Sequence, residues 1–199
     1  VFVPNHRILS FFAADGAIAG HTANEHSDEA LYRTPLAGFA SACIVGPLIG
    51  MAKAALSHTL NHVVDRPVAY TYAKDQSALV STQLAVAEAA TKIDSAELHI
   101  HRAARDLDHA ATTSTELSLL VRARVRHDVG CGTHLLREAM TICQQINGSS
   151  DMTRGRSFER VWRDFSTSSN HAALNLATTA EVYGKILCGH DPSELSGLY

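Results

Sequence analysis

The stretch from Leu79 to Leu107, LVSTQLAVAEAATKIDSAELHIHRAARDL, carries the clearest structural pattern in the chain. Its large apolar residues recur every seven positions, at Leu79, Val86, Ile93, Ile100 and Leu107. A seven-residue spacing keeps one seam of an α-helix against its neighbours, and the alanines between these positions let the neighbouring helices approach closely. The sequence therefore predicts a long helix, from about residue 75 to residue 107, packed among other helices.

Three further segments have helical patterns. Residues 31–64 are apolar around most of a helix circumference, residues 116–146 contain glycines at Gly130 and Gly132, and residues 157–187 carry an apolar stripe. The two glycines predict a bend or a tight helix contact, and Ser114 or Thr115 is the expected N-cap of the third segment. Four long helices with short connections predict an all-α, up-and-down four-helix bundle over residues 31–199. Residues 1–30 are predicted to be an irregular leader that contains the end of a β-strand.

The composition limits the classes of partner. The chain has 199 residues, of which 46% are hydrophobic, and this is enough for one sizeable core. Its net charge is -3 and it has no basic block, so nucleic acid is not an expected partner. Residues 35–52 carry no charge but contain Pro47, glycines and serines. We expect this segment to be a helix buried centrally in the bundle and not a membrane span.

The cysteines and histidines show no metal-binding pattern. The chain contains four cysteines, Cys43, Cys131, Cys143 and Cys188, with no CxxC motif among them. We therefore expect reduced thiols in a cytoplasmic protein. His99 and His101 are two residues apart, which points their rings to different faces of a helix. The sequence thus predicts no metal ligands.

The segment WRDFSTSSNHAALN, residues 162–175, raises the main question about function. No charged residue occurs from Phe165 to Ala180, and His171 lies in the middle of this run. A solvated helix face is normally charged, whereas a buried imidazole needs hydrogen-bond partners. We therefore expect His171 to lie in an enclosed, polar and neutral hollow, as in a binding site. The alternative is a structural histidine that bonds to Thr167 or Asn175 across one helical turn.

Several motifs along the chain are shared with one known superfamily. They are VFVP at residues 1–4, LYRTP at 31–35, PLIGMAKAAL at 47–56, IDSAELHIHRAARDLD at 93–108 and ERVWRDFSTSSNHAALN at 159–175. With these motifs the chain resembles the C-terminal helical domain of the acyl-CoA dehydrogenase superfamily. More narrowly, it resembles the branch of flavin-dependent two-component monooxygenases that hydroxylate aromatic compounds. Such proteins carry an N-terminal helical domain and a β-barrel before this region, so the resemblance implies that the chain is a fragment.

The resemblance implies three groups of site residues. His171 stands where the dehydrogenases carry a carboxylate base, and it would deprotonate or polarise a phenol, because imidazole titrates near neutral pH. Arg33 would face the reduced flavin, either FMN or FAD. The turn of Gly148, Ser149 and Ser150 would contact the flavin tail, often that of a neighbouring subunit. From the residues alone, Arg33 equally suits a surface ion pair, and the turn equally suits a plain surface turn.

The resemblance also implies an activity and partners. The expected protein is an oxygenase component that hydroxylates a small aromatic substrate with O2 and with reduced flavin supplied by a separate flavin reductase. The chain has no GxGxxG motif for nicotinamide binding, which agrees with a separate reductase. The resemblance also implies a homo-tetramer. One alternative is an acyl-CoA dehydrogenase-like oxidoreductase, which lacks support because no Glu occurs between Glu159 and Glu181 or within residues 36–64. A second alternative is a non-catalytic helical oligomerisation module.

Overall fold

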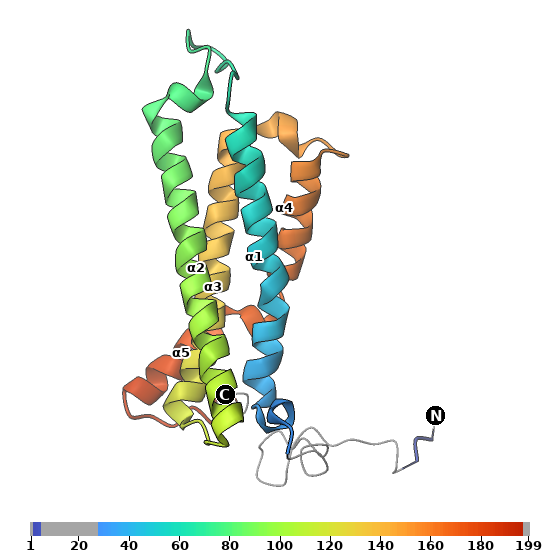
Figure 1. Cartoon of the computed structure of the whole chain (residues 1–199), viewed down its shortest axis with the longest axis vertical. Helices are drawn as coiled ribbons and strands as arrows, with labels where there is room; N and C mark the ends of the chain where they lie inside the picture. The colour runs from blue at the N-terminus through green and yellow to red at the C-terminus, as the bar shows by residue number, and fades with distance from the viewer. Residues whose placement is uncertain (1, 5–27, 197–199) are drawn as a thin grey trace.

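The computed structural model describes residues 2–4 and 28–196, apart from the side chains of Tyr32 and Arg33. Within these residues the chain forms helices and their connections and no strand, which confirms the all-α prediction. The long segments run alternately up and down the bundle (Figure 1). The elements are η3 (Ala30–Arg33), α1 (Leu36–His62), η4 (Gln76–Ala78), α2 (Val80–Thr113), α3 (Leu119–Asn147), η5 (Ser149–Met152), α4 (Ser157–Ser168), η6 (Ala172–Leu174) and α5 (Leu176–Leu187).

The predicted leader is largely beyond what the structure describes. Residues 2–4 adopt neither helix nor strand, and residues 5–27 lie outside the described ranges. The boundary between a leader and a bundle domain at residue 30 therefore stays a prediction. The first described helical turn is η3, which is followed by α1 after two intervening residues.

The predicted seam of α2 forms its buried face over the second half of the helix. Ile93, Ile100 and Leu107 are buried among alanines of the same face. At the beginning of the seam Val86 is only half-buried, and Leu79 is the N-cap residue just outside the helix. The heptad pattern therefore predicted the packing face of α2 correctly from Ile93 to Leu107, where neighbouring helices cover it.

The end of α2 differs from the sequence prediction. The helix continues to Thr113 and ends at Ser114, whose backbone has a φ of 53° in the left-handed region. Ser114 is thus a C-cap and not the N-cap of the next helix. That N-cap is Ser118, whose hydroxyl accepts a hydrogen bond from the Val121 backbone N–H at 3.4 Å. The Ser/Thr-rich connection contained both helix-ending and helix-starting residues, and sequence spacing alone did not separate them.

The central helix of the bundle is α3, which contacts α1, α2, α4 and α5. The prediction that residues 35–52 form a centrally buried helix was wrong. In the structure, α1 buries one face against α2, α3 and α4, while Leu36, Phe39 and Leu60 remain exposed. Among the described residues, α1 is the one helix long and apolar enough to cross a membrane by length and composition alone. Here it packs as a bundle helix with an uncovered apolar side.

The predicted fourth helix is divided into two. α4 ends at Ser168, and residues 169–175 form a connection that contains η6. After this break α5 packs against the lower part of α3 instead of continuing along the bundle (Figure 1). The apolar stripe predicted as one helix face is therefore distributed over two helices. Phe158 and Phe165 of α4 are core residues, whereas Val182 is buried from α5.

Gly130 and Gly132 mark tight helix contacts, as the sequence predicted. A Cβ atom on Gly132 would lie 2.9 Å from two carbons of the Ile100 side chain and 3.2 Å from the Ala96 carbonyl oxygen on α2. A Cβ atom on Gly130 would lie 2.5 Å from the Thr179 hydroxyl oxygen on α5. The glycines therefore let α3 approach a different helix on each of two sides.

Replacing Gly132 by alanine is expected to lower the free energy of unfolding by about 1–3 kcal/mol, because overpacking outweighs the gain in helix propensity. The matched control is Gly184→Ala in α5, where an added Cβ meets nothing within 4 Å. That control should raise the free energy of unfolding by about 0.4–1 kcal/mol. Urea unfolding followed by far-UV circular dichroism measures both values. Stabilisation by both substitutions would show that α2 and α3 do not meet as closely as described.

Candidate functional site

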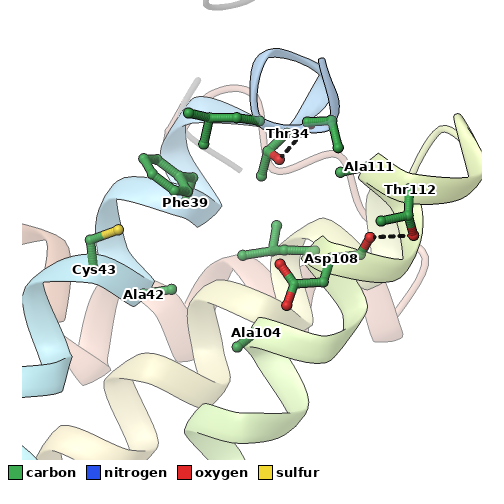
Figure 2. Close-up of a pocket in the computed structure, with 11 residues that line it drawn as sticks. Thr34, Phe39, Ala42, Cys43, Ala104, Asp108, Ala111 and Thr112 are labelled. Carbon is green, nitrogen blue, oxygen red and sulfur yellow. Dashed lines mark hydrogen bonds between the residues drawn. The ribbon is translucent and has the colours of Figure 1, made fainter. Parts of the chain in front are cut away.

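The described residues form a groove of about 550 Å³ between η3, α1 and α2 (Figure 2). Its volume lies in the range typical of small-molecule sites. The lining residues are Ala30, Leu31, Thr34, Phe39, Ala42, Cys43, Ala104, Leu107, Asp108, Ala111 and Thr112. We refer to this hollow as the α1–α2 groove.

The α1–α2 groove is open because small residues line it. Ala42 of α1 faces Ala104 and Ala111 of α2 across the hollow, and these three short side chains leave space between the two helices. The hydroxyl of Thr112 donates to the Asp108 carbonyl oxygen at 2.7 Å and is thus already engaged. The wall that a ligand would meet is therefore mainly apolar, with the Asp108 carboxylate as its acidic group.

Arg33 adjoins this groove through its backbone. It is the last residue of η3, between the lining residues Leu31 and Thr34, and α1 begins only at Leu36. The helical segment predicted over residues 31–64 therefore starts late, at Leu36, and Arg33 ends a separate 3-10 turn. The Arg33 side chain is not among those that the structure describes, so its contact with a flavin stays a prediction.

His171 is exposed and lines neither the α1–α2 groove nor the smaller hollow beside α4. The expectation of an enclosed site was wrong for the chain as described. The sequence alternative was also wrong, because the ring bonds to neither Thr167 nor Asn175. Instead, His171 Nδ1 accepts a hydrogen bond from the Ala173 backbone N–H at 3.2 Å and caps η6.

Polar residues in the uncharged run around His171 hydrogen-bond to backbone groups at or near helix ends. The Asn175 side-chain oxygen accepts from the Thr178 N–H at 3.3 Å and caps α5. Near the end of α4, the Ser166 and Ser168 hydroxyls donate to the Trp162 and Asp164 carbonyls, each at 2.7 Å. Ser, Thr and Asn satisfy backbone groups in this way without any charge. A run of such residues thus predicts a helix break as well as it predicts a cavity.

Arg137 on α3 stabilises this break. Its guanidinium donates to the carbonyl of Ser169, and through Nε to the Ser169 hydroxyl at 3.1 Å. Nη2 also donates to the Asn170 side-chain oxygen at 3.0 Å. A smaller hollow of about 250 Å³ lies beside it, lined by Arg137, Met140, Thr141, Trp162, Phe165, Ser166, Ser169 and Asn170. No local pattern predicted this contact, because Arg137 and Ser169 are far apart in sequence.

The turn of Gly148, Ser149 and Ser150 follows α3 directly. Gly148 has a φ of 74°, a left-handed value that favours glycine. Ser149 and Ser150 are exposed, and Gly148 offers no side chain to cap the first N–H groups of η5. The carbonyl of Asn147 before the turn accepts from Arg66 at 2.9 Å. The turn therefore presents hydroxyl and N–H donors to the outside.

Arg33 and the Gly148 turn lie at opposite ends of the bundle. η3 precedes the first residue of α1, whereas the turn lies near Arg66, beyond the last residue of α1 (Figure 1). With 27 residues in α1 and a rise of about 1.5 Å per residue, the separation is about 40 Å along the helix axis. One chain therefore cannot contact a single flavin with both groups.

All four cysteines are free thiols. Cys43 lies on the wall of the α1–α2 groove. Burial raises the pKa of the Cys131 and Cys143 thiols, so neither is activated as a thiolate nucleophile. The structure thus offers no reactive-cysteine chemistry at these two positions.

Comparison with known proteins identifies relatives along most of the chain. The FADH(2)-dependent resorcinol hydroxylase, oxygenase component, of Rhizobium sp. (strain MTP-10005) is 27% identical over 96% of this chain and 48% of its own length. The flavin-dependent monooxygenase oxygenase subunit HsaA of Mycobacterium tuberculosis (strain CDC 1551 / Oshkosh) is 25% identical over 98% of this chain and 49% of its own length. The chain therefore spans about half the length of these curated relatives.

Solved structures share the fold. XiaF from Streptomyces sp., in complex with FADH2 and glycerol, superposes with a TM-score of 0.87 at 28% identity and covers 96% of this chain and 48% of XiaF. The 3-HSA hydroxylase from Rhodococcus sp. RHA1 has a TM-score of 0.81 at 25% identity, over 96% of this chain and 49% of that protein. A family model described as "Acyl-CoA dehydrogenase, C-terminal domain" matches residues 42–176. Because that match spans more than half of the chain and the bundle agrees with it, the chain belongs to the acyl-CoA dehydrogenase C-terminal domain family.

Proposed function

We propose that this chain is the C-terminal portion of the oxygenase component of a flavin-dependent monooxygenase that hydroxylates a phenolic compound. The observation that carries the proposal is the similarity, over 96% of the chain, to both the resorcinol hydroxylase and the FADH2-bound XiaF. The name of the former as an oxygenase component supports a separate flavin reductase as partner. The alternative of an acyl-CoA dehydrogenase has no comparable support, and the chain lacks Glu in both segments that could supply its base.

The residues of this chain fit a reduced flavin and a small aromatic ring. The α1–α2 groove has mainly apolar walls and a volume suited to a flat ring, and Phe39 contributes an aromatic side chain. The Gly148 turn offers donors for a phosphate-bearing tail, and the exposed Arg154 and Arg156 follow it. Reduced FMN or FAD, when bound, activates O2 for transfer to an electron-rich aromatic carbon. The residues of this chain would bind the flavin, orient the aromatic substrate and handle a proton.

We assign the proton-handling role to His171 and derive the form of the ring from its contacts. Nδ1 accepts the Ala173 N–H, so in the neutral ring the hydrogen resides on Nε2. Nε2 is then a donor that polarises a phenol or stabilises its oxygen anion. For Nε2 to accept the phenol proton instead, the ring must give up its bond to Ala173. The capping contact therefore favours hydrogen-bond donation as the resting role.

The position of the two flavin-contacting groups supports an assembly of several copies. Since Arg33 and the Gly148 turn are about 40 Å apart in one chain, each flavin would be contacted by η3 of one copy and by the turn of another. The exposed apolar face of α1, with Leu36, Phe39 and Leu60, is available for burial between copies. We propose a homo-tetramer, in which such contacts also enclose His171. A cytoplasmic location remains part of this proposal.

The test uses the protein that contains this chain, supplied with a flavin reductase, O2 and a set of phenols. The expected result is a hydroxylated product whose new oxygen derives from isotopically labelled O2, detected by mass spectrometry. Oxidation of the reduced flavin without hydroxylated product for any phenol would contradict the proposal. Reduction of bound flavin by an acyl-CoA in the absence of O2 would favour the dehydrogenase alternative. Absence of any flavin binding would favour a purely structural module.

A further inference from the structure

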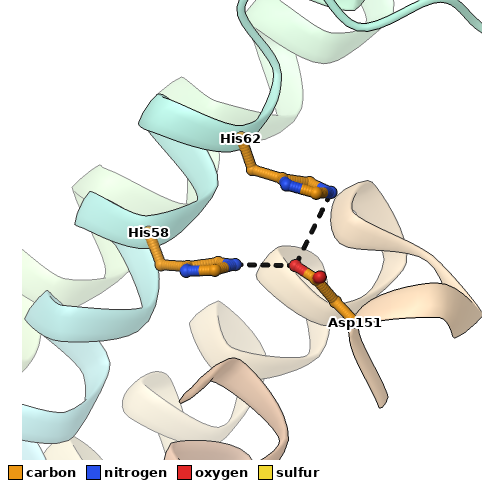
Figure 3. A group of neighbouring side chains, drawn as sticks. All are labelled: His58, His62 and Asp151. Carbon is orange, nitrogen blue, oxygen red and sulfur yellow. Dashed lines mark hydrogen bonds and ion pairs between the residues drawn. The ribbon is translucent and has the colours of Figure 1, made fainter. Parts of the chain in front are cut away.

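Three side chains with metal-binding atoms converge where α1 meets η5. They are His58 and His62 of α1 and Asp151 of η5 (Figure 3). The Asp151 Oδ2 atom lies 2.6 Å from His58 Nε2 and 3.6 Å from His62 Nε2. All three ligand atoms lie within 4.8 Å of one another. Two imidazoles and one carboxylate form the ligand set of many transition-metal sites.

The three side chains are held in position by their surroundings. His58 and His62 are one helical turn apart, so both rings extend from the same face of α1 toward Asp151 (Figure 3). The rings stack with centroids 5.5 Å apart, and the buried Phe158 packs against His58 with centroids 5.4 Å apart. Asp151 has a side chain only 5% exposed. The donor set is thus largely preorganised by the fold.

One ligand atom of this cluster has no hydrogen-bond partner. His62 Nε2 is buried and makes no hydrogen bond. Buried polar atoms without partners are rare in folded proteins, and an ion is one of the groups that satisfy them. The pKa of His62 is lowered, mainly by burial. The positive charges of Arg66 and Arg156 lower it further, whereas the Asp151 carboxylate raises it.

The two separations from Asp151 lie within about 1 Å of those expected around a small cation. In a tetrahedral zinc site with bonds of about 2.0–2.1 Å, neighbouring ligand atoms lie about 3.3 Å apart. The separation between His62 and Asp151 is close to this value, and the shorter separation between His58 and Asp151 requires a shift of under about 1 Å in the carboxylate. His58 and His62 are 30% and 29% exposed, so an ion can enter from solvent.

The charges around the cluster decide which ion it suits. A single carboxylate, opposed by Arg66 and Arg156, provides too little negative charge for Ca²⁺ or Mg²⁺, which depend on several oxygen ligands. Imidazole nitrogens bind Zn²⁺, Co²⁺, Ni²⁺ and Cu²⁺ well despite such charges. We propose that His58, His62 and Asp151 bind one first-row transition-metal ion of the zinc type, with the remaining position open to water. The ion would tie the end of α1 to the connection between α3 and α4.

The experiment uses the full chain without a histidine tag, titrated with Co²⁺ under visible absorption spectroscopy and with Zn²⁺ in a calorimeter. The wild type should bind one ion, and His62→Ala should weaken its binding by more than about tenfold. Loss of a residue that only supports a metal ligand already weakens metal binding by about tenfold, and loss of a ligand itself should cost more. His62 is the decisive position because its Nε2 makes no hydrogen bond, so its replacement by alanine breaks none. The contact between His58 and Asp151 remains in this variant. Asp151→Asn should weaken binding similarly.

The matched control is His134→Ala on α3, where a half-exposed histidine lies 3.5 Å from Glu138. This variant should bind the ion as the wild type does. Zn²⁺ should also raise the thermal unfolding midpoint of the wild type and of the control but not that of His62→Ala. The proposal is overturned if the wild type shows no saturable Co²⁺ spectrum, or if His62→Ala binds with unchanged affinity.

Discussion

Replacing Arg102 by methionine is expected to lower the free energy of unfolding by about 3 kcal/mol, although this side chain is partly exposed, because the change leaves a buried carboxylate without its cation. Asp128 on α3 is 0% exposed, whereas Arg102 on α2 is 45% exposed. Arg102 donates to Asp128 Oδ2 through Nε at 2.8 Å and to Oδ1 through Nη2. The hydrogen bond to Asp128 raises the pKa of the guanidinium above its usual range.

After this substitution the Asp128 carboxylate keeps one partner. His99 Nδ1 lies 3.0 Å from Asp128 Oδ1, so the carboxylate is not wholly unpaired and the expected loss lies near the lower end of the range for broken buried pairs. Methionine preserves much of the aliphatic stem, which limits the loss of packing. Chemical denaturation monitored by circular dichroism gives the free energy of unfolding.

The matched control for Arg102 is Arg124→Met, which removes another arginine between the same two helices. Arg124 lies 2.7 Å from Asp106, and both side chains are partly exposed, at 33% and 26%. Water can solvate Asp106 when its partner is lost, so the expected change is only about 0–1 kcal/mol. Equal effects of the two substitutions would contradict the idea that the burial of Asp128 sets the difference.

Replacing His171 by alanine in the protein that contains this chain should lower the rate of coupled hydroxylation by about 10²–10³-fold, the usual cost of removing a hydrogen-bond donor that stabilises an oxygen anion. The prediction depends on the proposed function. Reduced flavin should still be consumed, so the measured signature is a fall in product formed per flavin oxidised. Product is quantified by chromatography and O2 consumption by an electrode.

His171 also caps η6, so a structural effect must be separated from a catalytic one. His171→Asn is the appropriate second variant, because asparagine is a good N-cap residue and retains an acceptor for the Ala173 N–H. This variant should fold like the wild type yet remain as deficient in coupled product as His171→Ala. If His171→Asn restores coupled hydroxylation, the histidine serves the helix end and not the reaction.

The candidate site was only partly predictable. The sequence drew attention to His171 and to the Gly148 turn, but it did not identify the α1–α2 groove, because the residues that leave it open are alanines on two helices. It also gave no signal for His58, His62 and Asp151, since the carboxylate is 89 positions from the nearer histidine. The neutral run around His171 was misinterpreted because capping residues and cavity residues have the same composition.

By itself the sequence determined that the chain folds into long antiparallel helices, that α2 packs through Ile93, Ile100 and Leu107, and that Gly132 marks a close helix contact. These features follow from periodicity and residue size, which are local properties. Only the tertiary structure decided that α3 is the central helix and that the last predicted helix is broken at residues 169–175. The pairing of a buried Asp128 with a surface arginine likewise emerged only there. The physical reason is that burial and polar pairing depend on groups distant in sequence, whose approach no local pattern records.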